Sequence, residues 1–431
     1  MIEKRLRKYI FPSILAMTGV SLYILADTFF ISVAAGADGI CALNLILPIW
    51  CLLFAFAAMI GTGAATRYSI VKASGGTDAN KYFSNAIFFA LIVSLPFVLG
   101  GLIIPDKVLI LLGANEEILD VGVIYLRTAM CFTPFFIINN IVSSFVRNDG
   151  APKVAMAATL ISSFFNIIFD YVFMFPMGLG MFGAALATGI SPVVGIAICL
   201  THYFSKNNTI KFEWCLPSIK KLYYSCILGI SGFISEIASG VTSLVFNFIL
   251  LYIAGNVGVA AYGVIANISI VCIAMFGGIA QGLQPMASEA EGRGENDVKT
   301  RVIRHSLIIG VIVAIIIVGA CWIFASPIVS IFNSEGSAEL QAYGEVGLRL
   351  YGLGFLFAGM NIIIAGFFGA VDKPRECAII SIIRGVVAIV AFAALLSALL
   401  GINGVWLSFA AAELVTLIVS CVMLYKSRGK A

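Results

Sequence analysis

Residues 9–33 read YIFPSILAMTGVSLYILADTFFISV and contain a single charged side chain, that of Asp27. The hydrocarbon core of a bilayer is about 30 Å thick, and about 20 apolar residues in a helix span it. The segment is therefore predicted to be a transmembrane helix. It follows the charged residues Met1–Lys8, but it is too long for a cleavable signal, so we expect it to be retained as the first span.

The composition of the whole chain agrees with this first segment. Of the 431 residues, 61% are hydrophobic and 11% are charged, whereas soluble domains carry about 25% charged residues. These values exclude the water-soluble classes. The net charge of +4 does not indicate nucleic-acid binding, because the basic residues lie in short loops and form no single basic face.

The same criterion predicts an all-α polytopic membrane protein with twelve transmembrane helices in two six-helix lobes. The spans of the first lobe lie near residues 9–33, 41–66, 86–105, 119–146, 153–175 and 181–203. Those of the second lie near residues 222–253, 258–283, 302–324, 340–368, 377–400 and 403–425.

The basic residues predict the orientation. Of the 26 lysines and arginines, 22 fall on one side of the predicted spans, including the C-terminal Lys426, Arg428 and Lys430. Lys107 is alone on the opposite side, and the other three lie within spans. Because cytoplasmic loops carry the excess of lysine and arginine, we expect a cell-membrane protein with both termini in the cytoplasm.

The two predicted lobes are sequence repeats. Leu126-Arg127, Asn139 and Pro152-Lys153 recur with identical spacing as Leu348-Arg349, Asn361 and Pro374-Arg375. Six spans return the chain to its starting side, so the repeats are parallel and related by a pseudo-twofold axis along the membrane normal. We expect an N-terminal lobe at 1–205, a cytoplasmic linker at 206–221 and a C-terminal lobe at 222–431.

Duplicated bundles of this kind are typical of transporters that work by alternating access. An enzyme is not expected: both histidines, His202 and His305, fall at the ends of spans. No nucleophile–base set and no phosphate-binding loop is present in the sequence.

Polar residues within spans are energetically unfavourable in a bilayer and mark candidate functional sites. Asp27, Asp170 and Thr188 each lie five to seven residues from the external end of a predicted span, which is roughly 8–11 Å of helix. Asn166 lies one turn deeper than Asp170 on the same helix face. Hard oxygen ligands at one level suit a small cation such as Na⁺, and two nearby carboxyl groups without a cation should take up a proton.

The alternative is that Asn166 and Asp170 only hold helices together by hydrogen bonds. The second half argues against it, because Ala388 and Phe392 stand at the positions of the repeat that correspond to these two. The scaffold is kept where the polar residues are lost. We therefore interpret Asp27, Asn166, Asp170 and Thr188 as a site for the coupling cation or proton.

Three further charged residues fall within apolar segments of the second half: Glu236, Arg384 and Glu413. Arg384 and Glu413 can form a structural ion pair or contact substrate. Glu236 can bind a cationic substrate or have a structural role. The sequence leaves these alternatives open.

Several motifs together resemble the MATE (multidrug and toxic compound extrusion) family, most of all its prokaryotic, DinF-like branch, over essentially the whole chain. They are the pair Asp27-Thr28, the turn Arg147-Asn148-Asp149-Gly150-Ala151-Pro152, Asn166-xxx-Asp170, Gly183-Ala184-Ala185-Leu186-Ala187-Thr188 and Gln284-Pro285.

The resemblance implies a V of two lobes and the export of organic, cationic, amphipathic compounds in exchange for Na⁺ or H⁺. It implies the same ion site in the first lobe and a bend of the first helix at Pro12. The acidic residues of a second-lobe site in other branches have no clear match here. A flippase for lipid-linked oligosaccharides is the alternative within the superfamily. No cofactor beyond the coupling ion is expected. The expected partners are drug-like molecules and membrane lipid, and no nucleic acid. The protein is expected to be a monomer.

Overall fold

The computed structural model describes residues 2–333 and 336–428, and these residues contain helices and connecting loops but no strand. Lys430, one of the basic residues that predict the orientation, lies outside the described residues. The helices of the first half are α1 (Ile2–Ala73), α2 (Ala79–Ile103), α3 (Pro105–Leu111), α4 (Glu116–Cys131), α5 (Thr133–Asn148), α6 (Pro152–Met174) and α7 (Gly180–Tyr203).

The second half follows the same plan. Its elements are α8 (Ile219–Gly292), α9 (Asn296–Ile323), α10 (Ala325–Phe332), α11 (Ala338–Gly352), α12 (Phe355–Ala370), α13 (Pro374–Ile382), the π-helical turn η1 (Ile383–Val387), α14 (Ala388–Leu400) and α15 (Ile402–Arg428). Residues 206–217 between α7 and α8 are not helical, where the sequence predicts the linker.

A glycine interrupts each of the two longest helices at corresponding places. Gly36 in α1 has φ 59° and ψ −147°, and Gly255 in α8 has φ 61° and ψ −154°. Side chains exclude this backbone region, which is in practice open to glycine alone. The sequence repeat that pairs Ala35-Gly36 with Ala254-Gly255 therefore marks a repeated reversal of the chain.

The described residues form nine helices that are long and apolar enough to cross a membrane, and eleven when the bent pairs α4–α5 and α11–α12 each count as one. This count already divides α1 at its glycine but takes α8 as a single helix of 74 residues. Dividing α8 at Gly255 in the same way brings the number to the predicted twelve. The chain is a polytopic helical membrane protein.

Each half has a hydrophobic core of its own. The first core extends from Ile31 to Ile210 and the second from Phe246 to Ala412. The second core also takes in Leu6, Tyr9 and Ile10 from the start of α1, so the first helix crosses from one lobe to the other. α1 continues through Pro12 with helical backbone angles and is interrupted at Gly36 instead; the bend expected at Pro12 stays a prediction.

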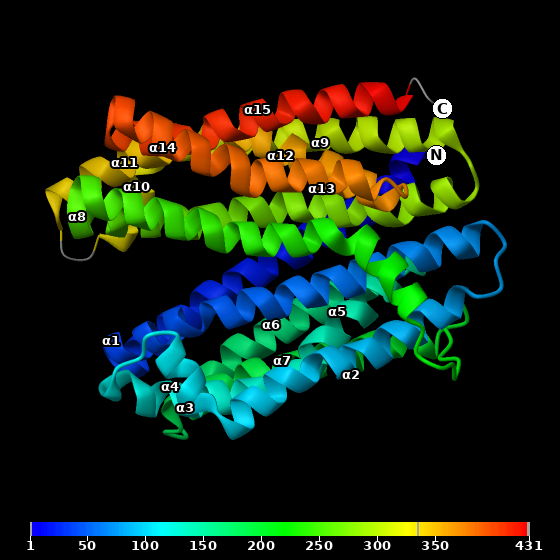
Figure 1. The fold of residues 1–431 in the computed structure, drawn as a ribbon, viewed down its shortest axis with the longest axis horizontal. Coiled ribbons are helices and arrows are strands. Elements are labelled where there is room, and N and C mark those ends of the chain that lie inside the picture. The colour runs from blue at the N-terminus through cyan, green and yellow to red at the C-terminus, as the bar shows by residue number, and fades with distance from the viewer. Residues whose placement is uncertain (1, 334–335, 429–431) are drawn as a thin grey trace.

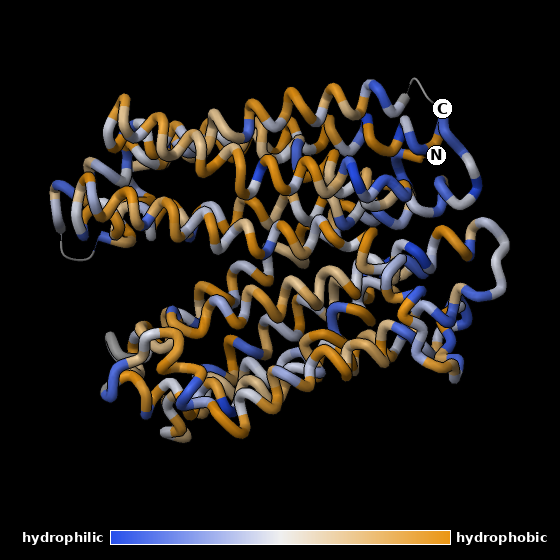
Figure 2. Tube along the Cα trace, viewed as in Figure 1, coloured by the Kyte–Doolittle hydropathy of each residue, from blue (hydrophilic) through white to orange (hydrophobic). Residues whose placement is uncertain are grey.

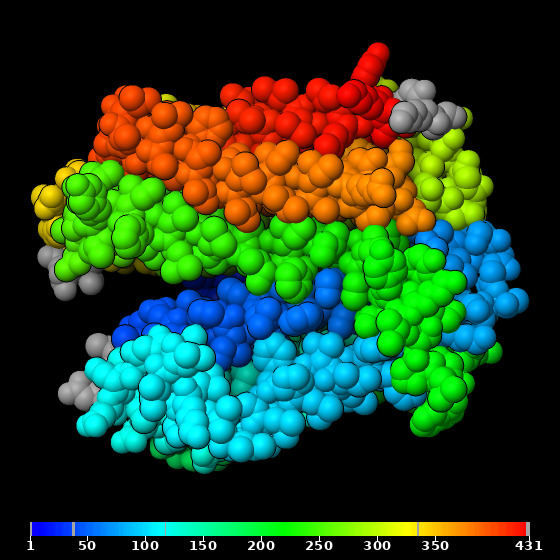
Figure 3. All heavy atoms as spheres, in the orientation of Figure 1, coloured from blue at the N-terminus to red at the C-terminus, as the bar shows by residue number. Residues whose placement is uncertain are grey.

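The two lobes meet at one end of the molecule and diverge at the other (Figure 1). Both chain ends lie at the end where the lobes meet, and hydrophilic residues gather there (Figure 2). Figure 3 shows a wedge-shaped cleft between the lobes that opens toward the opposite end.

Close backbone packing holds the lobes together where they meet. A Cβ atom on Gly63 of α1 would lie 1.9 Å from the carbonyl oxygen of Ser225 in α8. A Cβ atom on Gly229 of α8 would lie 1.9 Å from the carbonyl oxygen of Met59 in α1. Only glycine permits this approach, which is the usual role of small residues between membrane helices.

Hydrogen bonds and an ion pair also cross the junction. Gln284 of α8 donates to the backbone oxygen of Thr62 at 3.1 Å, and Arg67 of α1 pairs with Asp372 at 2.9 Å. Separating the lobes here requires all these contacts to break, so the structure is closed at the end that carries the termini.

Candidate functional site

Three helices of the first half bring together the four polar residues that the sequence predicts as a site. Asp27 lies on α1 before the break at Gly36, Asn166 and Asp170 lie one turn apart on α6, and Thr188 lies on α7. Asn166 and Asp170 are fully buried, and Asp27 and Thr188 are 9% exposed. The cluster is thus inside the lobe, between helices.

The Asn166 amide connects α6 to α7 in either of its two orientations. In one, its Nδ2 donates to the Thr188 hydroxyl at 3.3 Å. In the other, Nδ2 donates to Oδ2 of Asp170 at 3.2 Å, and Oδ1 accepts the backbone N–H of Thr188 at 3.3 Å. The second orientation pairs each amide atom with a complementary group, so Asn166 links Asp170 to α7.

The carboxyl groups of Asp27 and Asp170 are close enough to share a hydrogen bond. A hydrogen bond between two carboxyl groups requires a proton on one of them. Among the described residues, Oδ1 of Asp27 and Oδ1 of Asp170 each lack a hydrogen-bond donor. Leaving a buried carboxylate oxygen unpaired is unfavourable, so the pair is suited to binding a proton or a small cation.

Two tyrosines next to this pair are not predicted from the sequence. Tyr23 of α1 and Tyr125 of α4 both lie within electrostatic reach of Asp27 and of Asp170. Tyr23 precedes Asp27 by four residues, a spacing that places both on one helix face, and this signal was available. Tyr125 has no such signal, because it arrives from a separate helix.

The second half contains a different polar cluster, built from three helices. Nε of Arg384 in η1 donates to Oε1 of Glu413 in α15 at 2.6 Å. Asn361 of α12 donates to Oε2 of Glu413 at 2.8 Å. Arg384 and Glu413 therefore form an ion pair, which is one of the two alternatives that the sequence leaves open for them.

Glu236 is not part of this cluster. It lies half-buried on α8, within electrostatic reach of Cys51 in α1. One turn before it, Phe233 packs edge-on against Phe56 of α1, with ring centroids 5.4 Å apart. Glu236 therefore lies where the two lobes adjoin.

A third polar cluster surrounds Asp149, in the loop between α5 and α6. Its carboxylate, which is fully buried, accepts hydrogen bonds from Lys72 at 2.8 Å, Tyr68 at 3.0 Å, His202 at 2.9 Å and the Thr209 backbone at 2.9 Å. Burial alone would raise the pKa of this carboxyl. The hydrogen bonds from Lys72, Thr209 and His202 outweigh burial and hold the pKa of Asp149 below its ordinary value. The cluster fastens the linker to α1 and α7.

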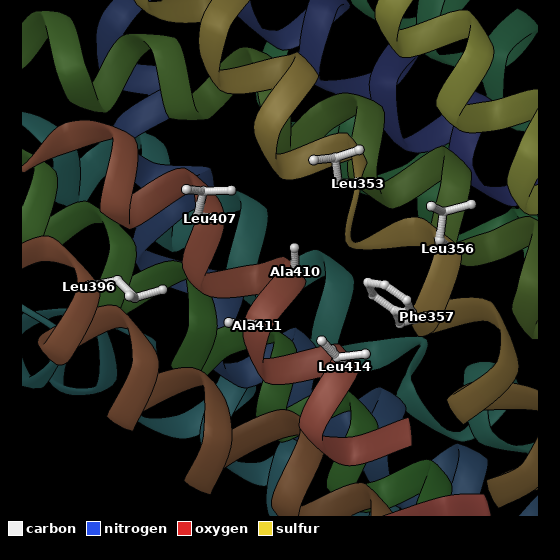
Figure 4. Close-up of a pocket in the computed structure, with 8 residues that line it drawn as sticks. All are labelled: Leu353, Leu356, Phe357, Leu396, Leu407, Ala410, Ala411 and Leu414. Carbon is white, nitrogen blue, oxygen red and sulfur yellow. The ribbon is translucent and has the colours of Figure 1, made fainter. Parts of the chain in front are cut away.

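Two cavities lie apart from the acid pair. One of about 380 Å³ lies between α12, α14 and α15, and leucine, alanine and phenylalanine side chains such as Leu356, Phe357 and Leu414 line it (Figure 4). The other, of about 260 Å³, adjoins Asp149 and His202. Neither cavity is lined by Asp27 or Asp170. The acid pair is enclosed by the helices of its own lobe.

Comparisons with known proteins agree on one family. The model of the MatE family matches residues 12–172 and 233–395. The multidrug export protein MepA of Staphylococcus aureus (strain MRSA252) is 28% identical over 422 residues, which cover 95% of this chain and 90% of that protein. MepA of Staphylococcus haemolyticus (strain JCSC1435) is 26% identical over 442 residues, covering 100% of this chain and 94% of the relative.

Solved structures share the fold. An outward-facing multidrug resistance MATE family transporter of the MOP superfamily has a TM-score of 0.93 at 22% identity, with 100% of this chain and 97% of that chain covered. A MOP superfamily transporter from Pyrococcus furiosus Vc1, described as having a binding pocket of reverse polarity, has a TM-score of 0.91 at 21% identity, covering 98% and 95%. Because one fold accommodates pockets of opposite polarity, the polarity must be argued from the residues of each chain.

Proposed function

This chain belongs to the MatE family, and on that premise we propose that it is a secondary active exporter of amphipathic organic compounds. Members of the family are membrane transport proteins and not enzymes. The MepA relatives are named as multidrug export proteins. We extend that activity to this chain, with cationic, drug-like compounds as substrates and membrane lipid as its surroundings.

The acid pair carries the proposal for coupling. Asp27 and Asp170 are buried side by side, and one oxygen of each lacks a donor. A site of this kind changes charge when it binds H⁺ or Na⁺, and charge inside a bilayer is energetically expensive. Ion occupancy therefore alters the relative energies of different helix arrangements, which is the requirement for antiport. Asn166 and Thr188 supply the neutral oxygens that Na⁺ also needs.

The orientation follows from the basic residues. They concentrate at the end where the lobes meet, and by the positive-inside rule we place that end and both termini in the cytoplasm. The cleft in Figure 3 then opens to the outside. In this state the external solution can enter the cleft, while the glycine contacts between α1 and α8 close the cytoplasmic side.

The test is efflux of a fluorescent cationic dye from cells that express the protein. Gradients of Na⁺ and of H⁺ are imposed separately, and each is collapsed by its own ionophore. We expect efflux that depends on at least one gradient and disappears in the Asp170→Asn variant. Efflux that persists without either gradient, or that Asp170→Asn leaves unchanged, would contradict the proposal.

A further inference from the structure

Glu413 and Arg384 differ in how many of their hydrogen-bonding groups have a partner. Glu413 is 2% exposed, and both of its carboxylate oxygens are hydrogen-bonded, one by Arg384 and the other by Asn361. Asn361 also donates to the Glu413 backbone oxygen at 2.8 Å and accepts from Ser420 at 2.9 Å. Each oxygen of this α15 carboxylate is thus bonded, one to η1 and the other to α12.

Arg384, by contrast, retains unused donors. A guanidinium group has five N–H donors, and Nε is the one nitrogen of Arg384 that donates to an acceptor among the described residues. Neither Nη is among the buried polar atoms that lack a partner, and 16% of the side chain is exposed. Both Nη groups therefore reach accessible space, with Glu413 holding the guanidinium from behind.

The backbone at Arg384 is built for this placement. Arg384 lies in the π-helical turn Ile383–Val387, a conformation that is rare and frequent at functional sites. In the same turn, Gly385 packs on α8, since a Cβ atom there would lie 2.2 Å from Cβ of Ala238. The turn lets η1 approach α8 closely while Arg384 faces Glu413.

The first half shows that the pair is not needed for packing. In the alignment of the two repeats, Ser162 corresponds to Arg384, and Pro192 corresponds to Glu413. That lobe packs without any charge at either position. A buried ion pair stabilises a fold little compared with apolar residues of similar volume, so its presence in one lobe alone indicates a role beyond packing.

The repeat also indicates which way Arg384 faces. Ser162, Asn166 and Asp170 are spaced four residues apart on α6, and the last two face the interior of their lobe. Arg384 corresponds to Ser162 and so lies on the same stripe of its own helix, one turn farther from the external surface. Tyr351, a buried residue of α11, is within electrostatic reach of Arg384 and of Glu413. Arg384 therefore faces the interior of the second lobe.

We propose that Arg384 binds the carboxylate of transported compounds, with Glu413 and Asn361 as positioning residues. The inference rests on the proposed function and assigns Arg384 as the residue that distinguishes amphipathic amines with a carboxylate from those without one. A guanidinium held by Nε presents its two Nη groups together, the arrangement that binds a carboxylate through two parallel hydrogen bonds.

The test uses a fluorescent amphipathic amine with a carboxylate and the methyl ester of the same compound. Binding of each is measured on the purified full-length protein in nanodiscs, for wild type, Arg384→Gln and Arg384→Lys. Arg349→Gln is the matched control, since Arg349 is an arginine of α11 whose side chain is 40% exposed and whose partner is Glu345 at 3.5 Å. Thermal unfolding of each variant is recorded in parallel, to separate lost binding from lost folding.

We expect Arg384→Gln to weaken binding of the carboxylate compound about tenfold or more, the loss expected for a hydrogen bond between charged groups, and to leave the ester unchanged. Arg384→Lys, which keeps the charge but lacks the planar fork, should give an intermediate affinity. Equal losses for both compounds, or a wild type that does not discriminate between them, would overturn the inference. Failure of cells to export either compound would count against the proposed function instead, because binding to the purified protein is measured independently.

Discussion

The two lobes repeat one scaffold but bury opposite kinds of polar cluster. The first lobe encloses two carboxyl groups, Asp27 and Asp170, whose Oδ1 atoms lack donors among the described residues. The second lobe encloses one carboxylate, Glu413, which is paired with Arg384 at 2.6 Å and also bonded to Asn361. One cluster needs an added positive charge, and the other is neutral as it stands.

This difference separates ion binding from packing. Both lobes reverse at a glycine with nearly the same backbone angles, and both begin a helix with a proline, Pro152 or Pro374. The scaffold therefore does not dictate which polar groups are buried. A pair of acids that must recruit a cation is suited to coupling, and a neutral pair with unused guanidinium donors is suited to substrate.

The largest effect is expected from neutralising the acids of the first lobe. Asp27→Asn and Asp170→Asn should each reduce gradient-driven efflux to the level of cells without the protein, because the amide can no longer exchange a proton. Membrane expression should remain near normal. The control is Asp297→Asn, at an exposed residue in the first turn of α9. Wild-type efflux by either site variant would show that the coupling ion binds elsewhere.

A smaller effect is expected in the second lobe. Glu413→Gln should impair efflux of a simple cationic dye less than Asp170→Asn does, because Glu413 is already neutralised by Arg384 and need not exchange an ion. Side-by-side dye efflux at matched expression measures the difference. If Glu413→Gln were the more damaging change, the assignment of coupling to the first lobe would be wrong.

Thr188→Ala should act within the first-lobe site without changing its charge. It removes a hydroxyl oxygen from the ligands of Na⁺ but no titratable group, so Na⁺ binding should weaken severalfold while proton-driven efflux persists. Competition between Na⁺ and pH in proteoliposomes reports the shift. Equal losses of Na⁺-driven and proton-driven efflux would indicate that Thr188 serves only to hold α6 and α7 together.

The smallest effect on transport is expected at Asp149, whose cluster joins the linker to α1 and α7 and is separate from the acid pair and from the Arg384–Glu413 pair. Because the pKa of Asp149 is lowered in the folded state, its stabilising contribution is present above the pKa of about 3.8 of an unfolded chain and disappears as the pH falls through the lower folded value. Asp149→Asn should therefore lower the Tm at pH 7, and the difference from wild type should shrink below about pH 4. A difference that stays constant with pH would contradict this account.

Much of the fold was predictable because membranes impose strong rules on sequence. Apolar segments of sufficient length predict the spans, the constant offset between matching motifs predicts the repeat, and matching depths predict that Asp27, Asp170 and Thr188 meet. Depth works here because each helix rises by a fixed distance per residue. These predictions need no knowledge of how helices pack.

Features that depend on packing between helices were not predictable. Tyr125 of α4 comes within electrostatic reach of the acid pair, and the start of α1 joins the core of the opposite lobe through Leu6 and Ile10. The π-helical turn at Arg384 has no signature in the residues IRGVV. The hydrogen bonds of Asp149 come from three separate elements. The partners of Tyr125, of the start of α1 and of Asp149 are far away in sequence, and no periodicity of the sequence predicts them.

Binding of Na⁺ to the purified protein, measured by calorimetry across a pH series, tests the shared acid site most directly. If Na⁺ displaces a proton from the Asp27–Asp170 pair, Na⁺ must bind more tightly as the pH rises, with an apparent affinity that increases by up to about tenfold per pH unit. The affinity should level off once both carboxyl groups are ionised, and the pH dependence should weaken in Asp170→Asn, in which Asp27 is the one acid of the pair that remains. An affinity for Na⁺ that stays constant with pH in the wild-type protein would contradict the account.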